Sequence, residues 1–475
     1  MNVLFVIKKD VYSSVEPLGI LYLSSVLKKG GHDVFLSGSS LDNISKLVKE
    51  KNIGIFAISC MNTDYKYYLN LSQEFKKVFP KILVIWGGPT PTYNPEIINQ
   101  SAIDIICRGE GEIALLELLN RLDNKQDYKN IPNLWVKKKS VVRKNEVGPF
   151  ISDLNSLPFP DHALIDNLPQ FKYSPIKFIM AGRGCPFNCS FCFNHKFHEL
   201  YRGKGKMVRT RDVGNVIEEL EALKTKYNAK FFYFLDDVFP FDRSWLTAFV
   251  KEYSRKINIP FTIVTSVVFI DDFFARHIKK AGCVSVHLAI ECGNEKLRRE
   301  VLNKPISNEQ IINACRILKR QGISISAYNM IGIPFSKFED ELKTLDLNLK
   351  AKVDATYVSF CLPFMDTQMG KKAFDAGLIS KDTEFLSWFE RIPIQVENRE
   401  KVEKFAHLFT LIVLFPPLRR YLSALLSLPI PKSVLKLLKD LLNGYSLKRK
   451  IIPVKISYME FFVTAFYFIS KRFTK

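Results

Sequence analysis

Residues 176–194 read IKFIMAGRGCPFNCSFCFN, and the interpretation of the whole chain starts from this stretch. The apolar run at 176–181 predicts a buried strand, and a loop rich in glycine, proline and asparagine follows it. The loop holds Cys185, Cys189 and Cys192 in the spacing C-x3-C-x2-C. A structural zinc site normally has four ligands, and disulfides use cysteines in pairs. The spacing therefore raises the question of which group needs three thiolates.

Strand-like and helix-like segments alternate on both sides of this loop. Before it, strands are predicted at 3–7, 34–37, 53–59, 82–86 and 103–107, with helices at 19–29 and 113–122. After it, strands are predicted at 231–235, 261–265, 284–290, 323–331 and 355–361, with helices at 213–226, 243–256, 271–281, 308–321 and 339–351. Such alternation predicts parallel sheets. We expect an α/β protein with a doubly wound (Rossmann-like) first domain and then a partial (β/α)6 barrel.

The length of 475 residues exceeds what one hydrophobic core usually supports, so several domains are expected. We place the first domain at 1–140 and a proline-containing linker at 141–172. The barrel core is placed at 173–375, and a small helical, basic C-terminal region at 376–475. Ligands of such sheets bind at the carboxyl ends of the strands, where the cysteine loop lies.

Composition predicts a cytoplasmic chain with reduced thiols, because neither a cleavable signal peptide nor a long apolar run is present. The six remaining cysteines stand in apolar surroundings and are interpreted as core thiols: Cys60, Cys107, Cys283, Cys292, Cys315 and Cys361. The formal net charge is +21. Residues 401–475 hold 14 Lys or Arg and 3 Asp or Glu, so about half of the excess lies there.

Three alternatives were weighed for the cysteine triplet. A zinc site could recruit His195 as a fourth ligand, but four ligands in one short loop do not match common zinc spacings. Three unconnected core thiols would not normally cluster beside glycine and proline. Thiolates also hold iron–sulfur clusters, and three of them leave one iron of a [4Fe–4S] cube open for catalysis. The last alternative is favoured.

The triplet, with Phe191 before its third cysteine, resembles the signature of the radical S-adenosylmethionine (SAM) superfamily. The resemblance implies that Cys185, Cys189 and Cys192 hold a [4Fe–4S] cluster whose open iron binds SAM, which is cleaved to a 5′-deoxyadenosyl radical. Segments 234–239 (FLDDVF), 289–295 (AIECGNE) and 329–334 (NMIGIP) resemble SAM-contacting motifs of the family. The SAM contacts implied are Phe191, Asp236, Asp237, Glu291 and Gly332. Residues 334–337 and 363–367 depart from the family pattern, so the substrate-side contacts stay open.

The N-terminal part resembles the cobalamin (B12) domain of the B12-dependent radical SAM subfamily. The resemblance is carried by 17–23 (PLGILYL), 30–34 (GGHDV), 87–92 (GGPTPT) and 108–112 (RGEGE), and with the barrel it covers about residues 1–370. The cobalamin contacts implied are Asn62, Thr63, Gly87, Gly88, Pro89, Thr90, Arg108, Gly109, Glu110 and Gly111. No D-x-H-x-x-G motif is present, and His32 is interpreted as structural, so the lower cobalt ligand stays unassigned.

The resemblance implies an enzyme that uses the cluster, SAM and cobalamin to methylate an unactivated carbon of a small-molecule or lipid-type substrate. Two alternatives remain open: a cobalamin-dependent radical cyclisation or rearrangement without methyl transfer, and a non-catalytic zinc or redox-sensing protein. The expected partners are the substrate and an electron donor such as flavodoxin or ferredoxin. A nucleic-acid partner is not expected, because no recognisable module is present.

The basic tail has two interpretations. Apolar stretches beside Lys and Arg clusters are what an interfacial helix requires, so residues 400–475 could contact the inner face of the membrane. Alternatively, they form a helical cap that packs over the barrel. The tail contains an apolar run at 407–415, a break at Pro416-Pro417, a basic amphipathic stretch at 433–442 and an aromatic run at 458–469.

Overall fold

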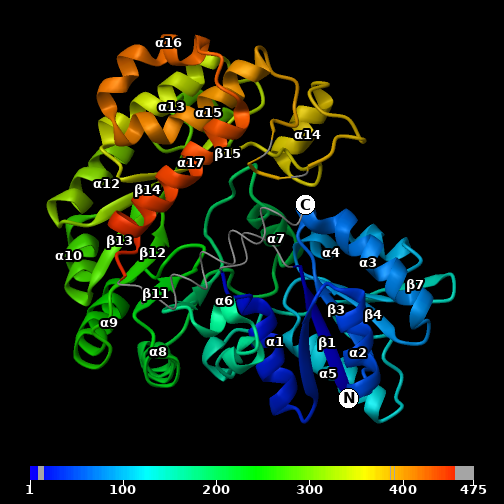
Figure 1. Ribbon diagram of the computed structural model, residues 1–475. Coiled ribbons are helices and arrows are strands. Elements are labelled where there is room, and N and C mark those ends of the chain that lie inside the picture. Colours follow the sequence, from blue (N-terminus) through cyan, green and yellow to red (C-terminus); the bar gives the residue numbers. More distant parts are fainter. Residues whose placement is uncertain (9–14, 386, 390, 455–475) are drawn as a thin grey trace. The chain divides into compact units, whose positions relative to one another are not determined.

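The protein, as a computed structural model, is described for residues 1–8, 15–385, 387–389 and 391–454. Its chain divides into two compact units (Figure 1). Of the described residues, unit 1 contains the ranges 1–174 and 196–209. Unit 2 contains the described residues of 175–195 and 210–454. The segment directly after the cysteine loop thus belongs to the N-terminal unit.

Unit 1 is built on a seven-stranded sheet in the order β2-β1-β3-β4-β5-β6-β7. The strands are β1 (Asn2–Ile7), β2 (Asp33–Gly38), β3 (Ile55–Ser59), β4 (Leu83–Gly87), β5 (Ile105–Cys107), β6 (Leu134–Lys138) and β7 (Val141–Lys144). The first five are parallel, whereas β6 and β7 are antiparallel. The order reverses between β1 and β3, which is where doubly wound sheets bind ligands.

Helices cover both faces of this sheet because the apolar residues of its strands alternate. Leu4 and Val6 of β1 join the core under α2 and α3, while Val3 and Phe5 join the core under α1 and α5. The helices of this unit are α1 (Leu18–Lys29), α2 (Leu41–Lys51), α3 (Tyr65–Val78), α4 (Pro89–Tyr93), α5 (Glu112–Asp123) and α6 (Pro169–Lys172). The predicted doubly wound arrangement is confirmed.

Residues 130–144 differ from the expectation. The linker was predicted to begin at residue 141, but Val141–Lys144 forms β7 and pairs with β6. Trp135 and Val136 of β6 are buried, and the hairpin extends the sheet beyond β5. The few apolar residues of this hairpin stand among lysines, so hydrophobic periodicity alone did not reveal it.

Unit 2 contains a sheet of six parallel strands in the order β15-β14-β13-β12-β11-β8, which forms a half-barrel. The strands are β8 (Ile176–Ile179), β11 (Phe231–Phe234), β12 (Phe261–Thr265), β13 (Cys283–Glu291), β14 (Ser324–Ile331) and β15 (Ala355–Phe360). All six predicted barrel strands are therefore confirmed, and each follows its neighbour in both sequence and space. Two short strands, β9 (Gly182–Arg183) and β10 (Arg209–Thr210), stand outside this sheet.

Helices pack along the outer face of the half-barrel (Figure 1). They are α8 (Val213–Tyr227), α9 (Arg243–Lys256), α10 (Asp272–Ala281), α12 (Asn308–Arg320) and α13 (Phe338–Ala351). Val286, Leu288 and Ile290 of β13 face this outer core. Because side chains alternate along a strand, the residues between them face the concave side.

The C-terminal part of unit 2 is helical, as expected. Its elements are α14 (Gln368–Asp375), α15 (Arg399–Leu414), η6 (Pro416–Tyr421), α16 (Leu422–Ser427), α17 (Lys432–Ser446) and η7 (Leu447–Ile451). Thr410 of α15 lies 3.1 Å from Thr356 of the edge strand β15, hydroxyl to hydroxyl. The aromatic run at 458–469 falls outside the described residues. No helix within the described part of the chain is both long and apolar enough to cross a membrane.

Candidate functional site

The cysteine loop lies between β8 and α7 (Asn194–Leu200), at the carboxyl end of the first barrel strand. Cys185, Cys189 and Cys192 form no disulfide and are partly exposed, whereas the six cysteines interpreted as core thiols are buried. Burial raises the pKa of Cys185 to about 11 and that of Cys192 to about 12, and metal coordination is what ionises such thiols. Within the described residues, no three His, Cys, Asp or Glu side chains form a compact ligand group for one ion.

His195 was weighed as a fourth ligand and interpreted as a polar group of the loop. It is 3% exposed, and its Nδ1 lies 2.5 Å from the Cys192 carbonyl oxygen. Its position is thus tied to the backbone of the third cysteine. The assignment of the three thiols as the cluster ligands stays a prediction.

Two aspartates follow β11 and have different environments. Asp236 is 3% exposed, and its carboxylate accepts hydrogen bonds from the backbone N–H groups of Ala181 (3.2 Å) and Gly182 (2.6 Å). Burial raises the pKa of Asp236 to about 7. Asp237 is exposed, yet surrounding protein raises the pKa of its carboxyl, and the side chain of Asn194 opposes the shift. Asp236 therefore holds the start of the cysteine loop, and Asp237 is the accessible carboxylate.

Glu291 ends β13 beside a cation that sequence reasoning missed. Its φ of 64° lies in the left-handed region, where a side chain other than glycine is strained. The Lys304 ammonium lies 3.4 Å from its carboxylate and donates to the carbonyl of Ala289 at 2.6 Å. Burial raises the pKa of Cys189, and the Lys304 charge opposes that shift. The end of β13 thus places one anion and one cation near the cysteine loop.

Gly332 follows β14 and adopts a φ of 72°. Glu341 of α13 accepts hydrogen bonds from its N–H at 3.0 Å and from the Ser336 hydroxyl at 2.8 Å. Burial raises the pKa of Glu341 to about 7. Phe191 packs on the small cluster that contains Cys292. The predicted SAM residues therefore stand on the loops that follow β8, β11, β13 and β14.

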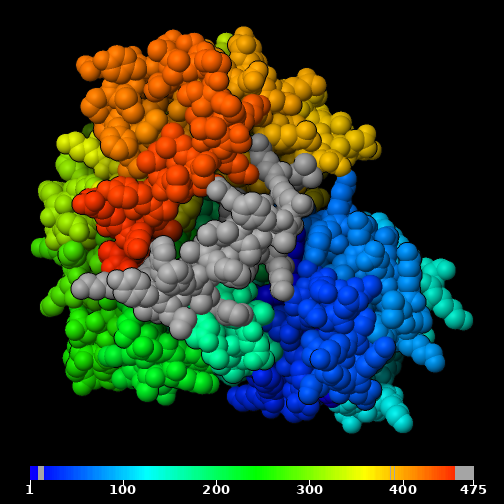
Figure 2. Space-filling model, viewed as in Figure 1, coloured from blue at the N-terminus to red at the C-terminus, as the bar shows by residue number. Residues whose placement is uncertain are grey.

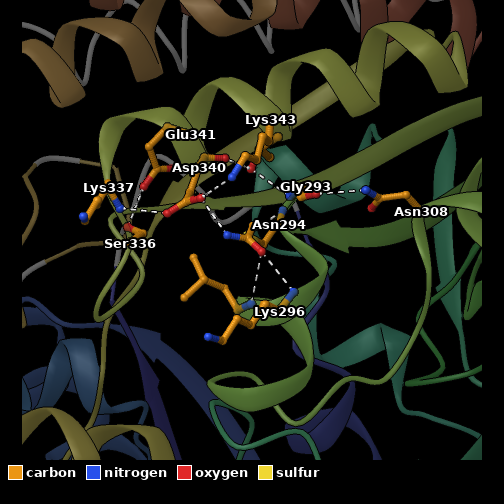
Figure 3. A network of polar contacts seen from close by, with 12 residues as sticks. Gly293, Asn294, Lys296, Asn308, Ser336, Lys337, Asp340, Glu341 and Lys343 are labelled. Atoms are coloured by element: carbon orange, nitrogen blue, oxygen red, sulfur yellow. Dashed lines mark hydrogen bonds and ion pairs between the residues drawn. The ribbon is translucent and has the colours of Figure 1, made fainter.

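A polar network joins two of these loops to α13 (Figure 3). Asp340 accepts from the side chain of Asn294 at 2.6 Å and from the backbone N–H of Lys337 at 3.0 Å. The Gly293 N–H donates to the Thr344 hydroxyl at 2.9 Å. A Cβ at Gly293 would lie 2.2 Å from the Lys343 carbonyl oxygen, so only glycine allows this approach. The network positions the loops after β13 and β14 against one helix.

The concave face of the half-barrel carries a layer of aromatic side chains that was not predicted. The His287 ring lies 5.1 Å from the Tyr233 ring and 5.6 Å from the Tyr328 ring, and Tyr357 lies 5.4 Å from Tyr328 (ring centroids). His287 is 0% exposed, and neither ring nitrogen has a hydrogen-bond partner. Burial lowers its pKa to about 3, so this layer is uncharged at neutral pH. The sign of this aromatic layer in the sequence was a histidine, His287, at a position of a predicted strand that faces the concave side.

In unit 1, the turn at 62–64 and the segments 87–92 and 108–112 lie at the carboxyl ends of β3, β4 and β5, at one edge of the sheet. Asn62 and Thr63 form a short turn, η1 (Asn62–Asp64), after β3, and the buried side-chain oxygen of Asn62 has no hydrogen-bond partner. Gly88 has a φ of 86°, and a Cβ there would lie 3.0 Å from the Cys60 nitrogen. Pro89 and Thr90 begin α4 directly after it. The turn at 62–64 thus follows β3, one of the two strands at the reversal of strand order.

The segment 108–112 has a structural role as well as the predicted one. The carboxylate of Glu110 pairs with Arg209 at 2.9 Å, and both side chains are at most 10% exposed. A Cβ at Gly109 would lie 2.0 Å from the Tyr201 hydroxyl, to which the Glu110 N–H donates at 2.9 Å. Arg108 lies over the Trp135 ring at 5.1 Å. Gly109 and Glu110 therefore hold residues 196–209 against the rest of unit 1. This contact was not predicted from the sequence.

The residues present fit the groups that the resemblance implied. Three partly exposed thiols on one loop are a donor set for iron–sulfur chemistry. The unpartnered Asn62 oxygen fits a polar ligand at the edge of the unit 1 sheet. The predicted contacts themselves stay predictions.

Comparison with known proteins supports both halves of this interpretation. A family model described as the radical SAM superfamily matches residues 179–347, and one described as the B12 binding domain matches residues 6–119. The chain is similar to an uncharacterized methyltransferase of Pyrococcus horikoshii, with 28% identity over 78% of this chain and 82% of that protein. It is also similar to the anaerobic magnesium-protoporphyrin IX monomethyl ester cyclase of Rubrivivax gelatinosus, with 29% identity over 68% of this chain and 60% of that protein.

Among solved structures, the radical S-adenosylmethionine methyltransferase TsrM of Kitasatospora setae, with cobalamin and a [4Fe-4S] cluster bound, has the same fold. The TM-score is 0.64, with 18% identity over 80% of this chain and 79% of that one. The matched domains follow one another in the predicted order. The chain therefore contains a radical SAM domain and a B12-binding domain, whose cofactors are a [4Fe–4S] cluster with SAM and cobalamin, respectively.

Proposed function

We propose that the chain is a methyltransferase that transfers a methyl group from SAM to an unactivated carbon of a small-molecule or lipid-type substrate. The observation that carries the proposal is the accessible cysteine triplet at the carboxyl end of the barrel strands, in one chain with a B12-binding domain. The methyltransferase relative supports it. When bound, the cofactors supply reductive cleavage of SAM and methyl transfer, with electrons from a flavodoxin or ferredoxin.

The chain's own residues bind and orient. Cys185, Cys189 and Cys192 would hold the cluster, and three ligands leave one iron for SAM. Asp236 fixes the start of the loop through the two backbone N–H groups it accepts from. Asp237 presents the accessible carboxylate beside that loop, where the ammonium group of SAM would be stabilised.

The concave face indicates what part of the substrate enters the half-barrel. Its layer of His287, Tyr233, Tyr328 and Tyr357 carries no charge at neutral pH. Phenol hydroxyls and neutral imidazole recognise hydroxyl or carbonyl groups and apolar rings better than carboxylates or phosphates. This supports a substrate whose reacting end is uncharged.

A second candidate function is radical cyclisation or rearrangement without methyl transfer, and the cyclase relative favours it. The two differ in their products from SAM. Methyl transfer yields both 5′-deoxyadenosine and S-adenosylhomocysteine, whereas a cyclisation initiated by hydrogen abstraction yields only the former.

The test uses the full chain with iron, sulfide and cobalamin, a reductant, and SAM carrying a deuterated methyl group. Extracts of small molecules and lipids are supplied as substrate and searched for a product that carries the label. A labelled product and both SAM-derived products are expected. Turnover that leaves the label out of every product would contradict methyl transfer. A Cys185→Ala variant should no longer form 5′-deoxyadenosine.

A further inference from the structure

Helix α17 turns apolar side chains toward solvent. Its residues Val434, Leu437, Leu441 and Tyr445 are 51%, 38%, 63% and 54% exposed. They recur at intervals of three or four residues, so they lie on one face of the helix. We call these four residues the α17 stripe. A surface helix normally faces its apolar stripe to the core, so this arrangement needs an explanation.

The inner face of α17 shows why the helix is oriented this way. Lys439 is 5% exposed and donates to the Val358 carbonyl oxygen of the edge strand β15 at 3.0 Å. Its ammonium also lies 5.6 Å from the Phe389 ring centroid. Leu435 and Ser446 are buried on the same side. The helix is therefore held by a buried lysine, and the apolar stripe is left outside.

Positive charge accompanies the stripe. Lys432 and Lys436 stand at its amino end, and the exposed Lys448, Arg449 and Lys450 follow directly after the helix. Residues 399–454 contain eleven Lys or Arg and three Asp or Glu. In Figure 2 these residues, coloured orange to red, form a continuous part of the visible surface. The stripe thus lies in a strongly basic part of the molecule.

A groove beside α17 is lined partly by residues of that helix. It has a volume of about 990 Å³ and is lined by apolar and basic side chains. Its cations already have partners in the chain. Arg419 pairs with Asp346 at 2.6 Å, and Lys432 pairs with Glu403 at 3.0 Å. These two ion pairs compensate part of the positive charge of the groove.

We propose that α17 docks the protein on a membrane that contains anionic lipids. The helix lies in the plane of the interface, with the stripe at the boundary between headgroups and acyl chains and the lysines and arginines on the phosphates. Exposed apolar side chains between basic clusters are what an interfacial helix requires. Nucleic acid would use the charges but not Val434, Leu437 and Leu441. The docking would bring a lipid-type substrate to the proposed enzyme, but it does not depend on methyl transfer.

The test is co-sedimentation of the full chain with vesicles of phosphatidylcholine, with and without phosphatidylglycerol. We expect binding to the anionic vesicles that weakens as salt is added. The double variant Leu437→Ser/Leu441→Ser should bind at least about tenfold more weakly, because two leucines leave the apolar boundary. Lys436→Gln should lose roughly fivefold. Both changes are at exposed positions, so the fold is preserved.

Matched controls lie in unit 1. Val141 is 73% exposed and the Lys46 side chain is 73% exposed. Val141→Ser therefore removes an exposed apolar side chain, and Lys46→Gln an exposed positive charge, at positions outside the α17 stripe. Neither should alter binding. Wild-type protein that ignores anionic vesicles, or a double variant that binds like wild type, would overturn the proposal. Self-association that the double variant abolishes would assign the stripe to contacts between copies, and would also overturn it. Neither outcome bears on the SAM-derived products, so methyl transfer is tested separately.

Discussion

Asp236 should be required for the cysteine loop to hold its shape. In Asp236→Ala, the buried N–H groups of Ala181 and Gly182 lose their acceptor. A buried donor without a partner costs about 1–3 kcal/mol, so two cost about 2–6 kcal/mol. At high pH the loss is partly offset, because removing a buried carboxylate also removes its desolvation penalty. Burial raises the pKa of Asp236 from 3.8 to about 7, so this offset grows between those two pH values. We therefore set the unfolding measurement at about pH 4 and expect a loss of about 2–4 kcal/mol.

The assay combines urea unfolding, followed by circular dichroism, with iron content after anaerobic reconstitution. Asp236→Ala should lose both stability and iron, because the loop that starts at Gly182 carries the three thiols. Asp236→Asn keeps one acceptor oxygen and should lose about half as much stability. Asp271 accepts from the Phe274 N–H at the start of α10, so Asp271→Asn is a control that should keep its iron. An Asp236→Ala protein with wild-type stability and a full iron complement would refute the positioning role.

Four further predictions follow from other contacts. Glu110→Leu should destabilise unit 1 by about 3–5 kcal/mol in calorimetry, because it removes the ion-pair partner of the buried Arg209. The double variant Glu110→Leu/Arg209→Met should recover part of that loss. If the effects of the two single changes simply add, the two side chains are not energetically coupled. Gly293→Ala should lower stability by about 1–3 kcal/mol and weaken SAM binding in titration calorimetry, because its Cβ would lie 2.2 Å from the Lys343 carbonyl oxygen. Gly214→Ala is the control and should not destabilise the protein, because no atom lies within 4 Å of the added Cβ. Glu341 has a folded pKa of about 7 against an ordinary 4.5, so its native form binds the proton more tightly and wild-type stability should fall as pH rises from about 4.5 to 7; urea unfolding of Glu341→Gln should lack this component, and an unchanged pH slope would contradict it. Metal analysis after anaerobic purification with cobalamin should find about four irons and one cobalt per chain. Zinc without iron would instead indicate a structural zinc site at the three cysteines.

The sequence predicted regular elements well where hydrophobic period and composition agree. Strand β12 (Phe261–Thr265) and helix α9 (Arg243–Lys256) have the predicted bounds, because each has one clear apolar pattern and a strong boundary. The β6–β7 hairpin was missed because its apolar residues are few. Its burial comes from pairing with β5 and from packing of Trp135, which are contacts made only after the sheet forms.

The location of the candidate site could be predicted from the sequence, but the contacts of its individual side chains could not. Parallel strands end at one edge, so motifs that follow different strands were expected together. A sequence motif does not show which group a carboxylate will contact in the folded chain. Asp236 was assigned to SAM but holds backbone N–H groups of a loop 54 and 55 residues away. Glu110 was assigned to cobalamin, and its carboxylate pairs with Arg209, 99 residues along the chain.

These two carboxylates point to a shared reason why such motifs are charged. A loop that binds a large cofactor must keep many backbone groups at the surface, and such loops have few apolar contacts to hold them. A buried carboxylate that accepts from backbone N–H groups supplies the missing order, and so does a paired one. Asp236 does this for the start of the cysteine loop, and Glu110 does it for the segment that begins four residues after Cys192. The buried acidic residues in these motifs thus order the loops. The accessible Asp237 is therefore a stronger candidate for ligand contact than Asp236.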